Sequence, residues 1–184
     1  MKKIISLFQR NYDGDRKVRD EIVPGAEWVP AGEGIATRKW NGTACLWKDG
    51  KLWKRYDAKH GKTPPEGFLP AQSEPDAVTG HWPGWLPVGL GKEDAWHREA
   101  LAVPLQEGAT YELCGPKVQG NAEHFSVHWL IKHGAAVLSP CPRAYDALRN
   151  YLQVAEIEGI VWWHPDGRMV KIKAKDFPSQ YDVS

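Results

Sequence analysis

The chain carries an ordered set of charged residues and one glycine that suits chemistry on phosphate groups. In chain order the set is Lys39, Gly42, Arg55, Glu112, Glu158, Lys171 and Lys173. A lysine amine can attack phosphorus, while further cations hold phosphate oxygens and a carboxylate holds a divalent metal ion. A lysine followed by glycine three residues later is common by chance. The order of the whole set, rather than this pair, therefore indicates chemistry on phosphate groups.

Lys39 is the candidate nucleophile. The amine must be neutral to react, and an ordinary lysine pKa of ~10.4 leaves about one amine in a thousand neutral at physiological pH. Nearby cations disfavour the charged form, and each unit of lowering raises the neutral fraction about tenfold. We expect Lys171 and Lys173 to supply that field, with a bound metal ion adding to it. The alternative is a surface lysine at the end of a strand.

Glu158 and the C-terminal lysines are predicted to meet on one hairpin. The His-Pro-Asp-Gly sequence at 164–167 favours a tight turn, so the flanking strands run antiparallel. Glu158 then lies within a residue or two of Lys173, and a bulge would shift the register by one. Lys171 and Lys173 share a face by period-two alternation, with Lys175 further along it. The alternative is a surface ion pair worth under about 1 kcal/mol.

The ordered set resembles the covalent nucleotidyltransferase superfamily of polynucleotide ligases and capping enzymes. In that superfamily a lysine attacks the α-phosphate of a nucleotide. The segments Tyr-Glu-Leu-Cys-Gly-Pro at 111–116 and Glu-Gly-Ile-Val-Trp at 158–162 are most similar to those of small RNA ligases. The resemblance covers residues 28–176. Asn41 departs from the commoner Lys-x-Asp-Gly, at a position where RNA ligases vary.

The resemblance implies a role for each matching residue. Lys39 would form the lysyl-nucleotide phosphoramidate with ATP, and Glu158 would bind Mg²⁺ or Mn²⁺. The other charged residues would contact the nucleotide: a phosphate for Arg55, the ribose for Glu112, and the α-phosphate and leaving pyrophosphate for Lys171 and Lys173. Such a site works by positioning and positive charge, with little proton chemistry.

Three further residues are candidates for nucleotide binding. Trp129 would stack on the adenine, although core packing is the alternative for any single tryptophan here. Thr37 would offer base contacts through its backbone, although a plain strand residue is equally plausible. Gly42 belongs to the lysine motif itself. A zinc site at His124 and His128 is rejected, because no HExxH motif or suitably spaced cysteine accompanies them.

The length of the chain suits one domain, and the strands and helices expected along it make the class α+β. The chain has 184 residues and a net charge of +1, so any nucleic-acid site must be local, as in the lysine-rich segment 48–62. Three cysteines without CxxC spacing suit a reducing compartment, and we expect a cytoplasmic protein. The apolar run at 4–8 is too short for a signal peptide or a membrane span. We expect neither a membrane association nor an obligate protein partner.

The predicted fold is antiparallel β-sheets with flanking helices. Strands are expected at 2–8, 34–40, 43–48, 51–56, 109–114, 126–131, 135–138, 159–163 and 169–174. Helices are expected at 93–103 and 143–154, and Asp49-Gly50 should form a type I′ turn. The proline-rich segment 63–92 reads as an irregular loop fixed by Trp82 and Trp85. A single domain would span 1–184, with an N-terminal segment 1–27 and a core 28–176. The resemblance implies a nucleotidyltransferase (ligase adenylylation) domain without an OB-fold domain.

The predicted function is that of an ATP-dependent RNA ligase. It would seal 5′-phosphate and 3′-hydroxyl RNA ends through a lysyl-AMP intermediate, with RNA ends as its partners. One alternative is a minimal DNA nick ligase, which nicked DNA and RNA substrates would separate. The other is a non-catalytic nucleotide- or RNA-binding relative of the ligases. A label from radioactive ATP that survives denaturation would distinguish the last from an enzyme.

Overall fold

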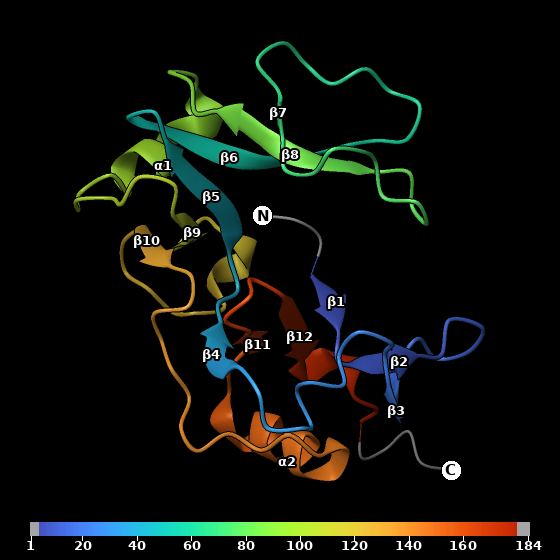
Figure 1. Ribbon diagram of the computed structural model, residues 1–184. Helices are drawn as coiled ribbons and strands as arrows, with labels where there is room; N and C mark the ends of the chain where they lie inside the picture. The colour runs from blue at the N-terminus through green and yellow to red at the C-terminus, as the bar shows by residue number, and fades with distance from the viewer. Residues whose placement is uncertain (1–3, 180–184) are drawn as a thin grey trace. The chain divides into compact units, whose positions relative to one another are not determined.

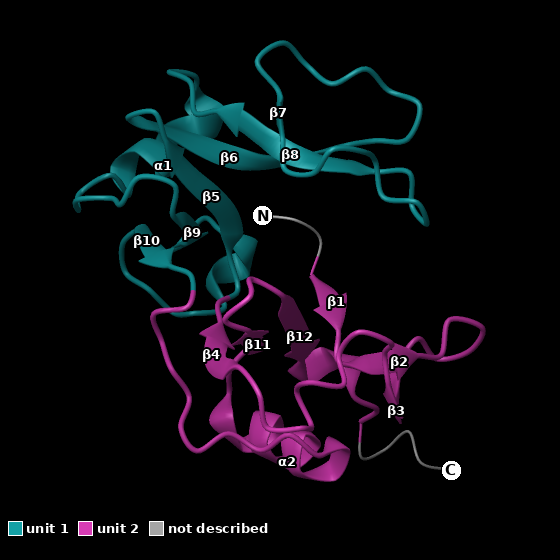
Figure 2. Ribbon diagram, in the orientation of Figure 1, with its two compact units in different colours: residues 1–3, 41–133 teal, residues 4–40, 134–184 magenta. Residues whose placement is uncertain are grey.

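The computed structural model describes residues 4–179 and divides into two compact units. Unit 1 comprises residues 41–133 of the described chain, and unit 2 comprises residues 4–40 and 134–179 (Figure 2). The chain crosses from unit 2 to unit 1 after Trp40 and returns after His133. The predicted Lys-x-x-Gly motif is therefore split, since Lys39 belongs to unit 2 and Gly42 to unit 1.

Unit 1 is built on a six-stranded antiparallel sheet in the order β10-β9-β5-β6-β8-β7 (Figure 1). Its strands are β5 (Thr43–Lys48), β6 (Lys51–Ala58), β7 (Leu69–Pro70), β8 (Trp82–Pro87), β9 (Thr110–Cys114) and β10 (Trp129–Lys132). Asp49 and Gly50 join β5 to β6 with φ of 54° and 66°. Positive φ at both central residues is the mark of the type I′ turn, so that prediction is confirmed.

Strands β7 and β8 lie inside the segment predicted as an irregular loop, and that prediction was wrong for this part. Prolines hid the strand because they cannot donate to a ladder. In β8 the Pro83 carbonyl accepts from Ala71 N, on the side of β7. Pro87 follows four residues later and so directs its backbone the same way. Both prolines therefore turn their missing N–H away from β6, and the β6–β8 ladder stays intact.

One face of the unit 1 sheet carries the hydrophobic core. The core residues are Cys45, Leu52, Ala100, Tyr111, Leu113, Val118 and Leu130. The helix predicted at 93–103 is shorter, with a 3₁₀ turn η1 (Lys92–Asp94) leading into α1 (Ala95–Glu99). Pro104 keeps Val103 out of the helix, because the residue before a proline avoids the helical conformation. A second 3₁₀ turn, η2, spans Gln119–Asn121.

Unit 2 contains a four-stranded sheet in the order β1-β12-β11-β4, beside a two-stranded ribbon. The sheet strands are β1 (Ile5–Ser6), β4 (Ile35–Lys39), β11 (Gly159–Trp163) and β12 (Met169–Lys173), and the ribbon strands are β2 (Phe8–Arg10) and β3 (Val18–Ile22). All pairings are antiparallel except the short parallel contact of β1 with β12. The 3₁₀ turn η3 (Ala174–Asp176) follows β12.

Helix α2 (Tyr145–Ala155) covers one face of the unit 2 sheet (Figure 1). Its Leu148 and Leu152 are buried in one cluster with Ile160 and Ile172 from the central strands. The helix prediction at 143–154 is therefore confirmed within two residues. The α+β class with mainly antiparallel sheets is confirmed as well, although helices are few.

Most predicted strands are confirmed within a residue or two, with three departures. The strand expected at 126–131 begins at Trp129, and 135–138 contributes only a bridge from Val137 to Thr37. The strand expected at 2–8 is divided between β1 and β2, and its residues 2–3 lie outside the described chain. Strand β3 was missed because the three consecutive charged residues in its middle give no alternation of apolar and polar side chains.

Candidate active site

The lysines predicted to do the chemistry in unit 2 share one face of its sheet. Lys39 lies opposite Gly159, which lies opposite Lys173, so the three form one row across β4, β11 and β12. The neighbouring row of the same face runs from Thr37 through Val161 to Lys171. Residues between these rows point into the core by alternation, and Ile160 and Ile172 are fully buried there. The sheet thus presents three lysines on the face opposite its core.

Glu158 joins two of these lysines. Its Oε2 lies 2.6 Å from Lys39 Nζ and its Oε1 lies 3.1 Å from Lys173 Nζ. Gly159 makes the arrangement possible, because it places no side chain between the lysines of its row. A Cβ at this position would lie only 2.1 Å from the Ile172 carbonyl oxygen. The prediction that Glu158 lies within a residue or two of Lys173 is confirmed.

Lys171 is the lysine whose proton affinity is most clearly changed. Its pKa is lowered to about 8, mainly by burial and also by the positive charges of Lys173 and Lys39. Asp176 and Glu158 oppose the shift. The field of crowded cations predicted from the sequence therefore acts on Lys171, whereas Lys39 is held in an ion pair with Glu158.

Asp176 fixes the end of the strand that carries Lys173. Its Oδ2 accepts from the Lys173 backbone N–H at 3.1 Å, and its Oδ1 accepts from Arg10 Nη2 at 2.7 Å. The chain turns here into η3, so Lys175 is not on the strand face where it was predicted. The capping carboxylate ends the strand at Lys173, and the Lys175 side chain is exposed.

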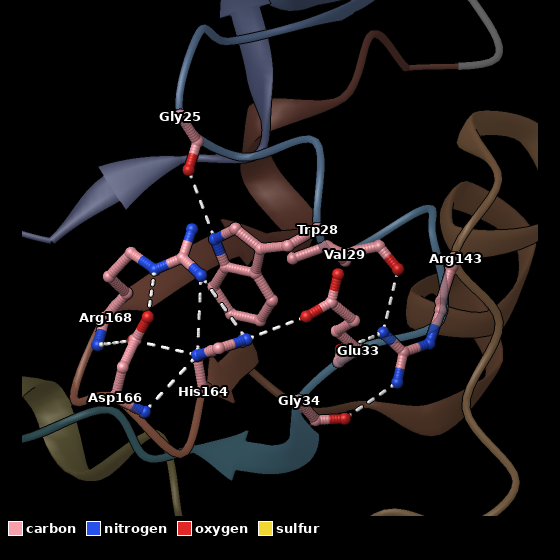
Figure 3. A network of polar contacts seen from close by, with 9 residues as sticks. All are labelled: Gly25, Trp28, Val29, Glu33, Gly34, Arg143, His164, Asp166 and Arg168. Carbon is pink, nitrogen blue, oxygen red and sulfur yellow. Dashed lines mark hydrogen bonds and ion pairs between the residues drawn. The ribbon is translucent and has the colours of Figure 1, made fainter.

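A network of polar contacts ties the segment before β4 to the start of α2 (Figure 3). Arg143 donates to the carbonyl oxygens of Val29 and Gly34 at 2.8 Å each, and also to that of Glu33. One guanidinium thus satisfies three carbonyls of an irregular loop. Strand β4 begins at Ile35, directly after these carbonyls, so this contact anchors the loop that leads into the strand ending at Lys39.

The same loop is bound to the turn of the β11–β12 hairpin. His164 Nε2 lies 2.8 Å from Glu33 Oε2, and His164 Nδ1 lies 2.8 Å from Asp166 Oδ1 (Figure 3). Arg168 pairs with Asp166 at 2.7 Å and lies over the ring of Trp28. The network therefore joins the loop before β4 to the turn of the hairpin that carries Gly159 and Lys173.

In unit 1, the predicted residues Glu112, Arg55 and Trp129 share one face of the sheet. Glu112 lies between Tyr111 and Leu113, which are core residues, and so points to the opposite face. Lys54 pairs with Cys45 of the core face, which puts Arg55 on the same face as Glu112. Leu130 pairs with Leu113, and Trp129 is therefore on that face as well. The register thus brings all three to the face opposite the core.

Glu112 is held by His133, a residue that the sequence reasoning missed. Glu112 is 8% exposed, and its Oε2 lies 2.7 Å from His133 Nε2. Gly42 packs directly on this side chain, since a Cβ at position 42 would lie 2.9 Å from Glu112 Cγ and 2.2 Å from the Leu113 carbonyl oxygen. Only a glycine therefore allows the chain after Lys39 to approach β9 so closely.

Arg55 lines a cavity of about 160 Å³ on its face of the sheet. The other lining residues are Asp57, Asp76, Thr79, His81 and Pro83. Its Nε donates to Asp57 Oδ1 at 2.7 Å, and its guanidinium lies 5.5 Å from the ring centre of Trp85. The ring and the carboxylate together hold the guanidinium in the lining of this cavity.

The two remaining candidates differ in accessibility. Trp129 is 43% exposed on the edge strand β10, so its ring is open to a stacking partner. Thr37 is 2% exposed, and its hydroxyl donates to the Val161 carbonyl oxygen at 3.0 Å while accepting from Trp163 Nε1 at 2.9 Å. Its hydroxyl is thus engaged within the sheet.

Glu158 is the carboxylate through which the lysine cluster would meet a metal ion. Residues 4–179 contain no group of three or more His, Cys, Asp or Glu arranged to hold one. Mg²⁺ nevertheless fits such a site, because it is usually bound by one or two carboxylates together with substrate phosphates and water. Within the same residues no helix is long and apolar enough to cross a membrane.

Comparisons with known proteins find similarity to RNA ligase 1 over several overlapping parts of the chain. Residues 97–183 match the family model of RNA ligase 1. RNA ligase 1 of Mus musculus and that of Rattus norvegicus are each 27% identical over an alignment of 213 positions, which covers 75% of this chain and 65% of either relative. RNA ligase 1 of Danio rerio is 29% identical over 128 residues, covering 50% of this chain and 39% of the relative. The chain is a relative of the RNA ligases.

This RNA-ligase relative spans 65% of the length of the mouse and rat proteins. The matched region 97–183 contains Glu112, Glu158 and the lysines of β12, whereas Lys39 lies before it. The resemblance predicted from the ordered motifs is therefore confirmed at the level of the RNA ligases.

Proposed function

We propose that this RNA-ligase relative is an ATP-dependent ligase with a nucleotidyltransferase fold, which seals 5′-phosphate and 3′-hydroxyl RNA ends. The observation that carries the proposal is the row of Lys39, Gly159 and Lys173, with Glu158 bridging its lysines. A merely solvated face would have no reason to collect three partly buried lysines, two of them paired with one carboxylate. A phosphate-binding site needs such a cluster, because its positive charges hold the phosphate oxygens.

The first step is adenylylation of Lys39. The amine attacks the α-phosphorus of ATP, a nitrogen–phosphorus bond forms, and the bond to the pyrophosphate oxygen breaks. The ion-paired ammonium gives up one proton before the attack, and Glu158 Oε2 lies 2.6 Å away to accept it or to pass it to water. The nitrogen loses a second proton to water once the bond to phosphorus has formed. Lys171 and Lys173 place their positive charges on the same face, where negative charge develops on the transferred and leaving phosphates.

Glu158 would also hold Mg²⁺ or Mn²⁺, which neutralises charge on the phosphate oxygens when bound. Its engagement with a metal ion would weaken its ion pair with Lys39. The amine that is now paired would then be available as a nucleophile. This links the two roles of the carboxylate to one event, the arrival of the nucleotide with its cation.

The later steps move the AMP group and then release it. The 5′-phosphate oxygen of one RNA end attacks the phosphorus of lysyl-AMP, which restores the Lys39 amine. The 3′-hydroxyl of the other end then attacks the 5′-phosphate, a phosphodiester forms, and AMP leaves. Each step is a substitution at phosphorus, so the same cations serve all three.

The residues of unit 1 would bind the nucleotide. We propose that Glu112 accepts a hydrogen bond from the ribose, Arg55 contacts a phosphate, and Trp129 stacks on the adenine. Gly42 would allow the close packing on Glu112 that its missing side chain permits. Thr37 would act through the sheet that positions Lys39.

Labelling with radioactive ATP and Mg²⁺, followed by denaturation, tests the proposal. We expect a covalent AMP adduct on the Lys39 peptide, absent from Lys39→Ala and retained in the control Lys175→Ala. ATP should label the protein better than GTP, because the resemblance to RNA ligases favours ATP. Sealing of nicked RNA over nicked DNA would establish the substrate. An adduct unchanged in Lys39→Ala, or equal labelling by GTP, would refute the proposal, and no adduct at all would indicate a binding protein.

A further inference from the structure

His133 forms a hydrogen-bonded chain with two residues of β9. Its Nε2 lies 2.7 Å from Glu112 Oε2 and its Nδ1 lies 2.9 Å from Thr110 Oγ1. The His133 backbone N–H also donates to the Thr110 carbonyl oxygen at 3.0 Å, which continues the β9–β10 ladder past Lys132. The ring is thus anchored at its backbone and at both nitrogens.

The chain leaves one oxygen of Glu112 for a ligand. In the described part of the protein, Oε2 accepts from His133 and Oε1 receives no hydrogen bond. The threonine hydroxyl can donate to Nδ1 of a neutral ring or accept from a charged one. In both states Nε2 carries the hydrogen that points at Glu112. The contact therefore persists in either protonation state of the ring.

Glu112 needs this support because of where it lies. It is on the face opposite the core, 8% exposed, with Gly42 packed against its Cγ. A glutamate carboxylate turns easily about its last torsion, and an unanchored one would present its oxygens in many directions. A hydrogen bond to Oε2 fixes the plane of the group and so the direction of Oε1.

We propose that His133 is a positioning residue that aims Glu112 Oε1 at a hydroxyl of the nucleotide sugar and so sets the preference for ribonucleotides. The inference rests on the proposed function, in which Glu112 accepts from the ribose. A carboxylate oxygen accepts hydrogen bonds and cannot donate one. A sugar that lacks the hydroxyl leaves that oxygen buried and unpaired, which is what makes a site selective. Without His133 the oxygen can turn away, and the selectivity falls.

The test compares adenylylation rates with ATP, 2′-deoxyATP and 3′-deoxyATP in single turnovers. His133→Ala should reduce the preference for ATP over the discriminated deoxy analogue by about tenfold, the usual size of one lost hydrogen bond to a charged group. His133→Gln should restore most of it, because its amide nitrogen reaches the place of Nε2. The matched control is Lys132→Ala, which neighbours His133 but lies on the core face of β10 and pairs with Gln106.

The outcomes separate the inference from the proposed function. An adduct in the native protein establishes the function, and the ratio of rates then decides the role of His133. Equal losses with all three nucleotides in His133→Ala, with an unchanged circular dichroism spectrum, would show that His133 only stabilises the fold. If the native protein forms no adduct, titration calorimetry with the same nucleotides measures the preference for ATP over its deoxy analogues as a difference in affinity. No preference for ATP, or no binding, would overturn the inference.

Discussion

Lys39 and Glu158 form an ion pair of 2.6 Å although 119 positions separate them in the chain. The pair is partly shielded, with side-chain exposures of 20% for the lysine and 12% for the glutamate. Lys173 approaches the other oxygen of the same carboxylate. One carboxylate therefore balances two cations, and a ligand that competes for Glu158 changes the environment of both lysines at once.

The first prediction follows from that shared carboxylate. Glu158→Ala should reduce adenylylation about a hundred- to a thousand-fold, the usual cost of one preorganised group in such a site. Glu158→Gln should lose a similar amount, because an amide keeps the shape but neither binds the cation well nor balances the lysines. Rates measured over a series of Mg²⁺ concentrations, with circular dichroism as the folding control, provide the check. Near-native rates in both variants would show a surface ion-pair cluster only.

The second prediction concerns pH. Lys171 has a pKa of about 8 in the folded protein, lowered from 10.5. Between these values the unfolded chain binds more protons than the folded one, so the stability contributed by this group rises with pH. Below pH 8 it is charged in both states and its burial is unfavourable. We therefore expect Lys171→Met to be more stable than the native protein at pH 7, with the difference shrinking toward pH 10.

Urea unfolding of both proteins at several pH values measures this difference. Lys175→Met is the matched control, because its side chain is exposed and past the strand. A constant difference between Lys171→Met and the native protein across the range would show that burial does not lower the proton affinity of Lys171. In the activity assay, Lys171→Met should lose adenylylation below pH 8, where the native lysine carries the positive charge that stabilises the phosphate.

The hairpin was predictable because its determinants are local. A Pro-Asp-Gly turn fixes the register, and alternation then sorts Lys171 and Lys173 from Val170 and Ile172. Glu158 and Lys173 could be paired on that basis alone. Strand β4 could be placed as a strand, but its position beside β11 depends on Arg143, which binds carbonyls more than a hundred positions away. No short pattern encodes such a contact.

His133 and β8 were missed for different physical reasons. His133 continues the alternation of Trp129 and Ile131, so a longer strand would have placed it on the face of Glu112. The signal existed in the spacing, but a histidine after a lysine looks like a strand end. In β8 the prolines disfavour a strand prediction unless it is known on which side of the strand the hydrogen-bond donor is missing. That depends on the partner strand, which the sequence alone does not supply.

The third prediction tests the packing of Gly42. Gly42→Ala places a methyl group against the Leu113 carbonyl oxygen and Glu112 Cγ, at separations of 2.2 and 2.9 Å before relaxation. Relieving them should cost roughly 1–3 kcal/mol of stability, and nucleotide binding should weaken as Glu112 is displaced. Gly89→Ala is the control, since its Cβ would meet only Asp94 Oδ2 at 3.5 Å. Denaturant midpoints of the two variants should differ clearly, and equal midpoints would contradict the packing argument.

The last prediction concerns the guanidinium that sets the start of β4. Arg143→Ala leaves the carbonyls of Val29, Glu33 and Gly34 without their donor, which should cost about 2–3 kcal/mol for bonds to a charged group. Arg143→Lys should recover only part of this, because an ammonium group cannot reproduce the planar fork that reaches all three oxygens. Arg149 lies on the nearby helix α2 and pairs with the exposed Asp146, and it supplies the control Arg149→Ala. Hydrogen exchange at the β4 amides should quicken in Arg143→Ala and stay unchanged in Arg149→Ala. Slow exchange in both would show that the sheet holds β4 in register without the loop contact.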